Sequence, residues 1–210
     1  MSTVGVAPAP YGLVVTDRFE TCVVFMLGYP AVGKRTVGRH LADLLDGVLV
    51  DNQLIHHPVL ALFRWDGKSP LPADIWERTD PIRDAVMTTI EDLAPTTNSY
   101  VFTNCLEKGD WAATQYDRVR SLAHRRSSLF LAVVLTCDIE EQVRRIDTPD
   151  RIALMKGSDP EGYRWHRQHV TLFQPPPEDV LELDTTVVEP ARCAKRVYEA
   201  LIDRGLRHES

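Results

Sequence analysis

A glycine-containing loop that ends in a lysine is the part of this sequence best suited to chemistry. Residues Gly28–Thr36 read GYPAVGKRT, so four residues separate Gly28 from the pair Gly33–Lys34. A loop that curls around a phosphate can point several backbone N–H groups at its oxygens, and glycines let the backbone approach closely. Lys34 adds a compact positive charge. The pattern therefore predicts a phosphate-binding loop.

The residues on either side of this loop favour the same interpretation. The run Thr21–Leu27 is apolar, as a strand buried on both faces requires, and apolar residues at helical spacing follow the loop. The helix that begins after Gly33 would add its free N–H groups and the positive end of its dipole. The alternative is a strand–turn–helix whose glycines serve only the turn, but the strand–loop–helix context favours phosphate binding.

The remaining elements must bring other polar residues to this loop. Strands are expected near residues 21–27, 48–50, 99–106, 129–135 and 180–183, with helices between them. This alternation predicts a parallel sheet covered by helices on both faces, which binds ligands at the carboxyl ends of its strands. The segments expected to rim one crevice there are Gly28–Thr36, Asp51–Asn52, Thr103–Asn104, Asp138 and Asp184–Thr185.

Several helices have recognisable starts and buried faces. Asp80 is expected to cap a helix that begins at Pro81, and Asp138 with Glu141 resembles a capping pattern. Further helices are expected over about 110–126 and from Pro160 and Pro190, with a break at residues 148–151. The side chains expected to face inward are Ile82, Val86, Ile90 and Leu93 in the first helix and Trp111, Val119 and Leu122 in the helix over 110–126.

Size, charge and cysteine content limit the possible classes of protein. The chain has 210 residues, of which 44% are hydrophobic, and this is enough for one large domain. A net charge of −6 does not favour nucleic-acid binding, and the apolar runs are too short to cross a membrane. We expect a cytoplasmic protein without a secretory signal. The expected buried, unpaired thiols are Cys22, Cys105, Cys137 and Cys193.

Taken together, these features resemble the small P-loop kinases, such as the shikimate, gluconate and nucleotide kinases. The resemblance covers most of residues 21–205 and depends on the loop, on Asp51, on an arginine-bearing segment and on Leu183–Thr185, of which only the loop is highly specific. It implies a three-layer α/β/α fold with a five-stranded parallel sheet. Residues 1–20 would be a flexible extension and residues 21–210 one domain, with an acceptor-binding insert at about 53–98 and a mobile lid at about 147–175.

The resemblance also implies which residues bind ATP. The phosphates would contact the loop, and Thr185 would lie near the adenine. Arg151 and Lys156 would close over the nucleotide from the lid, where Arg144 or Arg145 could serve as well. The complete set of nucleotide-binding candidates is Gly28, Ala31, Val32, Gly33, Lys34, Arg35, Thr36, Arg151, Lys156 and Thr185, and the catalytic candidates are Lys34, Asp51 and Arg151.

The acceptor and metal candidates follow the second strand. In similar kinases a carboxylate at the position of Asp51 orients the acceptor hydroxyl or helps to hold Mg²⁺, although a loop aspartate can also simply cap the next turn. His56 and His57 could contact the acceptor or form a surface pair. Arg64 and Arg83 could bind an anionic acceptor or make surface salt bridges.

Two departures from the family pattern concern the metal. The hydroxyl residue that usually follows the lysine and meets Mg²⁺ is replaced by Arg35, and Thr36 comes one position later. The third strand ends in Thr103–Asn104, where many P-loop proteins carry an acidic residue. The predicted metal ligands are therefore Thr36 and Asp51, with water and the phosphates completing the shell.

The sequence thus predicts an ATP-dependent kinase that phosphorylates a hydroxyl group of a small molecule. A nucleoside or nucleotide kinase is the alternative among enzymes, and an ATP-binding regulatory module with little catalysis is the alternative from another class. The expected partners are a nucleoside triphosphate and a small-molecule acceptor, with no nucleic acid and no membrane.

Overall fold

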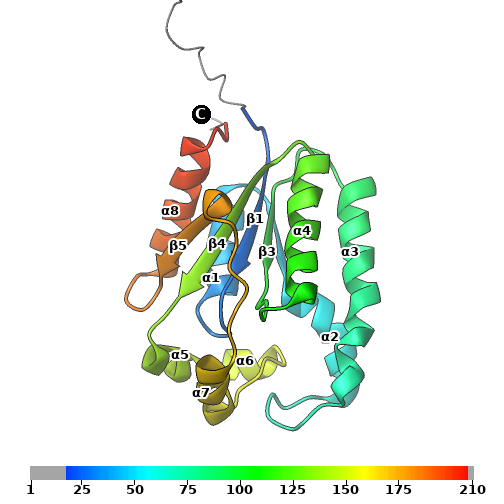
Figure 1. Cartoon of the computed structure of the whole chain (residues 1–210), viewed down its shortest axis with the longest axis vertical. Coiled ribbons are helices and arrows are strands. Elements are labelled where there is room, and N and C mark those ends of the chain that lie inside the picture. Colours follow the sequence, from blue (N-terminus) through cyan, green and yellow to red (C-terminus); the bar gives the residue numbers. More distant parts are fainter. Residues whose placement is uncertain (1–17, 208–210) are drawn as a thin grey trace, which may run out of the picture.

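The structure is a computed structural model that describes residues 18–207 (Figure 1). The expected N-terminal extension therefore lies outside the described residues, except for residues 18–20. Phe19 pairs with Leu206 in an isolated parallel bridge, which joins the start and the end of the described chain beside the sheet. None of the described helices is long and apolar enough to cross a membrane.

The centre of the fold is a five-stranded parallel sheet with the strand order β2-β3-β1-β4-β5. The strands are β1 (Cys22–Leu27), β2 (Val48–Asp51), β3 (Tyr100–Thr103), β4 (Leu129–Thr136) and β5 (Val180–Asp184). All five lie where the sequence predicted a strand. β1 is buried along its whole length because it lies between β3 and β4 and has helices on both faces.

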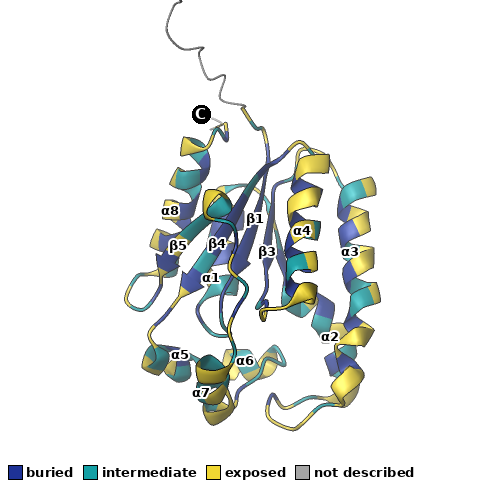
Figure 2. Ribbon diagram, viewed as in Figure 1, coloured by how far each residue is buried: buried dark blue, intermediate teal, exposed yellow. Residues whose placement is uncertain are grey.

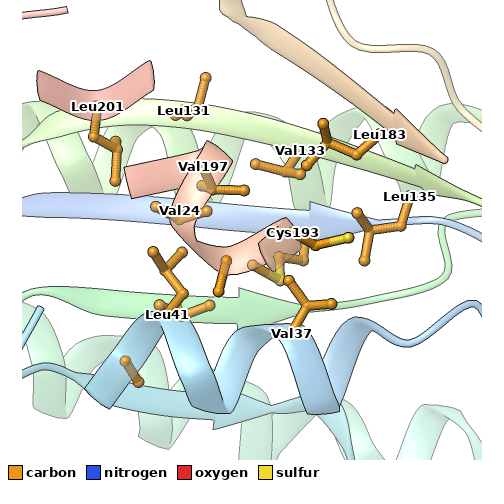
Figure 3. Close-up of a cluster of buried hydrophobic side chains, with 14 of the residues drawn as sticks. Val24, Val37, Leu41, Leu131, Val133, Leu135, Leu183, Cys193, Val197 and Leu201 are labelled. Atoms are coloured by element: carbon orange, nitrogen blue, oxygen red, sulfur yellow. The ribbon is translucent and has the colours of Figure 1, made fainter. Parts of the chain in front are cut away.

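Successive residues of β1 face two separate cores, as the period of a strand requires. Val24 and Met26 pack with the helices α1 (Lys34–Leu44) and α8 (Pro190–Asp203), through residues such as Leu41 and Val197 (Figure 3). Val23 and Phe25 face the other side, where α3 (Asp80–Asp92) and α4 (Asp110–Arg125) cover the sheet. The predicted three-layer α/β/α arrangement is confirmed.

The side of α3 that faces inward agrees with the prediction only in part, because Ile90 is buried and Val86 packs against the core as expected. Its buried residues are Arg83, Met87 and Ile90, whereas Leu93 is 80% exposed. The inward stripe includes a guanidinium because Arg83 donates to Asn52 Oδ1 on α2, a contact that a hydrophobic pattern does not reveal. The helix also begins at Asp80 itself, with Thr79 as its N-cap.

Trp111, expected to face inward in α4, is 46% exposed. Its ring lies 5.5 Å from the Arg83 guanidinium carbon. The indole therefore covers a buried charge at the surface of the helix layer instead of filling the core. Cys22, Cys137 and Cys193 are buried as expected, Cys105 is half-buried, and all four are free thiols.

The insert is helical from its first residue. α2 (Asn52–Phe63) begins directly after β2 and contains Pro58, and the short helices η1 (Ala73–Ile75) and η2 (Glu77–Thr79) lead into α3. The chain therefore leaves the carboxyl end of β2 as a helix, which places the first turn of α2 beside the ends of the neighbouring strands.

The lid consists of short helices at the carboxyl end of the sheet, and most of their residues are exposed (Figure 2). α5 (Ile139–Ile146) precedes it and is capped by Asp138, which accepts hydrogen bonds from the N–H groups of Glu140 and Glu141 as predicted. Where the sequence predicted a break, Pro149 starts the short helix α6 (Pro149–Ala153). α7 (Pro160–His169) begins where expected, and η3 (Pro177–Asp179) leads into β5.

Candidate functional site

A cavity of about 700 Å³ lies at the carboxyl ends of β1, β2 and β3, between the loop, α2 and the lid. The loop Gly28–Thr36 and the pairs Asp51–Asn52 and Thr103–Asn104 contribute to its wall, whereas Asp138 and Asp184–Thr185 do not. The cationic side chains that line it are Lys34, Arg35, Arg39, Arg144, Arg145, Arg151 and Lys156, against the two carboxylates of Asp51 and Asp150. The cavity is therefore strongly positive.

The backbone of the loop depends on its glycines. Gly28 has φ 139°, and a Cβ there would collide with the carbonyl oxygen of Leu135 on β4. Gly33 has φ 96° and is the N-cap of α1. Because α1 begins at Lys34, the N–H groups of its first turn have no carbonyl of a preceding turn to bind, and they are available to a ligand at the loop.

Lys34 is folded back onto this loop. Its Nζ donates to the carbonyl oxygens of Gly28 and Tyr29, both at 2.7 Å. Burial lowers the pKa of Lys34 to about 8, because the protein around the ammonium replaces water poorly. The side chain thus lies at the loop with its charge satisfied by two carbonyl groups, which phosphate oxygens can replace.

Asp51 is the centre of a buried network. Its Oδ2 accepts hydrogen bonds from Arg35 Nη1 at 2.8 Å and Lys156 Nζ at 3.1 Å, and its Oδ1 accepts one from Thr103 Oγ1 at 2.6 Å. Thr103 Oγ1 in turn accepts the N–H of Asn52 at 3.1 Å. The carboxylate is therefore held from the loop, from β3 and from the lid at once.

This network decides the charge of Asp51. Burial alone would raise its pKa, but the charge of Lys156 and the hydrogen bonds from Thr103 and Arg35 outweigh burial and hold the pKa below its usual range. Asp51 is consequently anionic at neutral pH and a weak base. Such a group suits the orientation of a hydroxyl better than the removal of its proton.

The same network argues against a magnesium ion held by the protein. Magnesium binds oxygen atoms, and the two predicted ligands are Thr36 and Asp51. Both oxygens of Asp51 are already engaged by two cations and a hydroxyl. Asn104 Oδ1 accepts the N–H of Cys105 at 2.8 Å. In residues 18–207 no group of three or more His, Cys, Asp or Glu side chains could hold a metal ion. As arranged, the carboxylate of Asp51 and the amide oxygen of Asn104 do not fit the ion.

On the insert side, His56 is held in a neutral form. Arg83 Nη1 donates to Asn52 Oδ1 at 3.0 Å, so the amide nitrogen of Asn52 is the donor to His56 Nε2 at 3.1 Å. Burial and then the charge of Arg83 lower the pKa of His56 to about 4. The His56 ring lies 5.0 Å from that of Trp76, which also lines the cavity.

The other three acceptor candidates do not reach the cavity wall. His57 and Arg64 are exposed, on α2 and at its C-cap, and Arg83 is buried behind Asn52. Arg83 therefore positions Asn52 and does not line the cavity. Sequence reasoning placed Asn52 and Thr103 at the rim of the crevice, from their position at the ends of strands, but it gave neither residue a role.

The lid lies against the insert. Gln53 Nε2 donates to Met155 O at 3.3 Å, and the N–H of Ser158 donates to Gly67 O at 2.9 Å. Lys156 reaches Asp51 from between these two contacts. The segment predicted to be a lid therefore contacts the predicted insert and contributes to the wall of the cavity.

Arg151 lines the cavity from α6 and bonds to its own segment. Its Nε and Nη2 both donate to Gly157 O, at 3.2 and 2.7 Å, and its guanidinium carbon lies 5.9 Å from the ring centre of Tyr163. The predicted arginine and lysine of the lid are thus both at the cavity, but Lys156 alone of the two contacts Asp51.

Thr185 supports the loop from below. Its Oγ1 lies 2.9 Å from Val32 O, and its carbonyl oxygen and Oγ1 both accept hydrogen bonds from Arg145, at 2.7 and 3.1 Å. Arg145 Nε in turn donates to Glu141 Oε1 at 2.7 Å. Val32 and Thr185 lie outside the cavity wall, and their contact ties the loop after β5 to the loop Gly28–Thr36.

No protein-family model matches the sequence, and no curated protein matches it either. Solved structures do match the fold. A sugar kinase from Janibacter sp. HTCC2649 is 17% identical with a TM-score of 0.57, and the match covers 90% of this chain and 99% of that chain. A gluconokinase from Sinorhizobium meliloti 1021 is 18% identical with a TM-score of 0.52 and the same two coverages, 90% and 99%.

A third match is the Mycobacterium tuberculosis APS kinase, solved in complex with AMPPNP and APS. It is 14% identical with a TM-score of 0.54, and the match covers 89% of this chain and 99% of that chain. These three structural neighbours are small-molecule kinases, and the chain has the P-loop α/β/α fold that the sequence predicted.

Proposed function

We propose that this protein is an ATP-dependent kinase that transfers the γ-phosphoryl group to a hydroxyl group of a small molecule. One observation carries the proposal: the glycine loop with Lys34 and the carboxylate of Asp51 face the same cavity, which seven cationic side chains line in a chain of net charge −6. A polyanion suits such a cavity. The neighbouring APS kinase, which shares the fold, was solved with the nucleotide AMPPNP.

The nucleotide phosphates are assigned to the loop. Their oxygens would accept hydrogen bonds from the first N–H groups of α1 and from Lys34, which exchanges its two carbonyl partners for phosphate. Arg151 and Lys156, which line the cavity from the lid, would neutralise charge on the transferred group. This arrangement supplies positioning and charge stabilisation, which account for most of the catalysis in phosphoryl transfer.

The acceptor is assigned to the side of α2. Asp51 Oδ1 has two lone pairs and uses one for Thr103, so the second can accept the hydrogen bond of an acceptor hydroxyl. The hydroxyl oxygen would form a bond to the γ-phosphorus while the bond from that phosphorus to the β–γ bridging oxygen breaks and its electron pair leaves with ADP. In a loose transition state the hydroxyl loses its proton late, to water, so an orienting carboxylate is sufficient.

The proposal is tested by incubating the protein with ATP and a metabolite mixture and following ADP and new phosphorylated species by mass spectrometry. We expect an acceptor-dependent product that Lys34→Met abolishes. Lys195→Met is the matched control, because Lys195 is exposed on α8. A phosphorylated nucleoside or nucleotide would identify the alternative kinase class. Tight ATP binding with no product from any acceptor would replace the kinase with a regulatory module.

A further inference from the structure

The residue after Lys34 is the least expected part of the loop, because a guanidinium stands where a metal-binding hydroxyl is usual. Arg35 lies in the first turn of α1, and its side chain is 37% exposed. It reaches across the cavity and donates to Asp51 Oδ2 at 2.8 Å. Arg35 therefore lies between the phosphate-binding loop and the carboxylate that a metal would otherwise use.

The charges around this position disfavour a divalent cation. Asp51 contributes one negative charge, and two cations, Arg35 and Lys156, bind the same oxygen of it. Lys34 is a third cation near this site. Burial lowers its pKa most, the charge of Lys156 lowers it further, and the charge of Asp51 raises it. A metal ion at Asp51 would have to displace a guanidinium and an ammonium and remain beside them, although like charges repel strongly at short range.

A guanidinium can do the positional work of the missing ion. It is planar, permanently charged and carries five N–H donors that match phosphate oxygens in pairs. In residues 18–207, Arg35 pairs through Nη1 with Asp51 alone, which leaves its other N–H donors for a ligand. Asp51 fixes the direction of the side chain, as a buried carboxylate with three partners is itself well fixed.

We propose that Arg35, oriented by Asp51, takes the place of a protein-bound metal ion and binds the outer phosphates directly. The protein would then bind a nucleoside triphosphate without a divalent cation. This inference rests on the proposed nucleotide-binding function and adds which residue replaces the metal contact. It concerns binding, so its test does not require the acceptor to be known.

The first experiment compares two conditions on the unmodified protein. ATP binding is measured by titration calorimetry in EDTA and in excess Mg²⁺. We expect dissociation constants that differ by less than about threefold, because the phosphate contacts come from the protein. Binding that is lost in EDTA and present with Mg²⁺ would overturn the inference and leave the proposed function standing. Absence of ATP binding in both conditions would overturn the two together.

The second experiment replaces the guanidinium by the usual hydroxyl. In EDTA, Arg35→Ser is expected to weaken ATP binding by about 10- to 100-fold, which is the range for one charge-assisted contact. Mg²⁺ is expected to restore most of this loss. The matched control is Arg196→Ser, at an exposed position of α8. ATP affinity of Arg35→Ser equal to that of the unmodified protein in EDTA would overturn the role of Arg35, with circular dichroism showing that both variants fold.

Discussion

The two sides of the cavity are built in different ways. On the loop side, Lys34 bonds to carbonyl groups five and six residues earlier in the chain. The proposed acceptor side is the wall formed by Asp51 and α2. There Arg83 bonds to Asn52, 31 positions away, and Asp51 accepts hydrogen bonds from Thr103 and Lys156, 52 and 105 positions away. The contacts of Lys34 are therefore local, although Gln142 and Thr185 also bind the loop at Pro30 O and Val32 O, whereas the network around Asp51 forms only when α2, β3 and the segment that carries Lys156 come together.

Because of this difference, substitutions on the two sides of the cavity should have different effects. On the loop side, the backbone depends on single residues such as Gly28, whose positive φ and close approach to Leu135 leave no room for a Cβ. The acceptor side is a network, and a change in one member is felt by the others. We therefore expect substitutions on the loop to affect nucleotide binding or stability, and substitutions on the acceptor side to affect turnover and acceptor binding.

The largest effect is expected at Asp51, where the two sides meet. Asp51→Asn keeps the size of the side chain but removes the charge that orients the acceptor hydroxyl and Arg35. We expect kcat to fall by about 100-fold or more, within the range for a general acid–base or orienting group. ATP affinity is expected to change far less. Steady-state kinetics and ATP titration measure the two quantities.

The measurements on Asp51→Asn can contradict the proposed difference between the two sides of the cavity in two ways. Unchanged kcat would make Asp51 a structural residue that caps and supports α2. An equal loss of ATP affinity and kcat would mean that the network serves the nucleotide more than the acceptor. The conservative variant Asp51→Glu is a useful companion, because it keeps the charge and moves it by about one methylene.

The sequence predicted the loop side better than the acceptor side, because the contacts of Lys34 are local whereas the partners of Asp51 lie far away in the chain. The five strands, the glycine loop and the start of α7 follow from patterns within a few residues, such as an apolar run or Asp159 before Pro160. No local pattern shows that Thr103 and Lys156 meet at Asp51. Nor does any show that Arg83 is buried in α3, because its polar partner lies on another helix.

The second effect concerns the stability of the loop. Gly28→Ala places a Cβ against the Leu135 carbonyl oxygen at a φ that favours glycine, and we expect a loss of about 3 kcal/mol in the free energy of unfolding. Gly33 also has a positive φ, 96°, but a Cβ there would meet no atom closer than 3.9 Å. We therefore expect Gly33→Ala to lower the free energy of unfolding by only about 1 kcal/mol, the lower range for such backbone strain.

Urea denaturation of both alanine variants measures this difference. Equal losses would mean that backbone conformation alone decides the loop and that its contact with β4 is unimportant. A larger loss at Gly33 than at Gly28 would contradict the close approach of the loop to Leu135.

The smallest effect tests two adjacent histidines that the sequence could not tell apart. His56 lines the cavity and is bonded to Asn52, whereas His57 is exposed outside it. Once an acceptor is known, His56→Ala is expected to raise its KM by about 5- to 10-fold, the value of one hydrogen bond. His57→Ala should leave KM within about twofold, as surface substitutions usually do. Equal effects of the two substitutions on KM would contradict the proposal that His56 contacts the acceptor and His57 does not.

The pH dependence of the same KM is a second test. It depends on the contacts of His56 with Asn52, and of Asn52 with Arg83, as well as on the position of the His56 ring. The pKa of His56 is about 4, lowered by burial and by Arg83, so the ring is neutral above that pH. Any contribution of His56 to acceptor binding should therefore be constant from about pH 5.5 to pH 8, whereas an unperturbed histidine would titrate near 6.5. A change in KM near that pH that His56→Ala removes would show that Arg83 and Asn52 do not hold His56 neutral. The prediction thus tests the contact between α2, which carries Asn52 and His56, and α3, which carries Arg83.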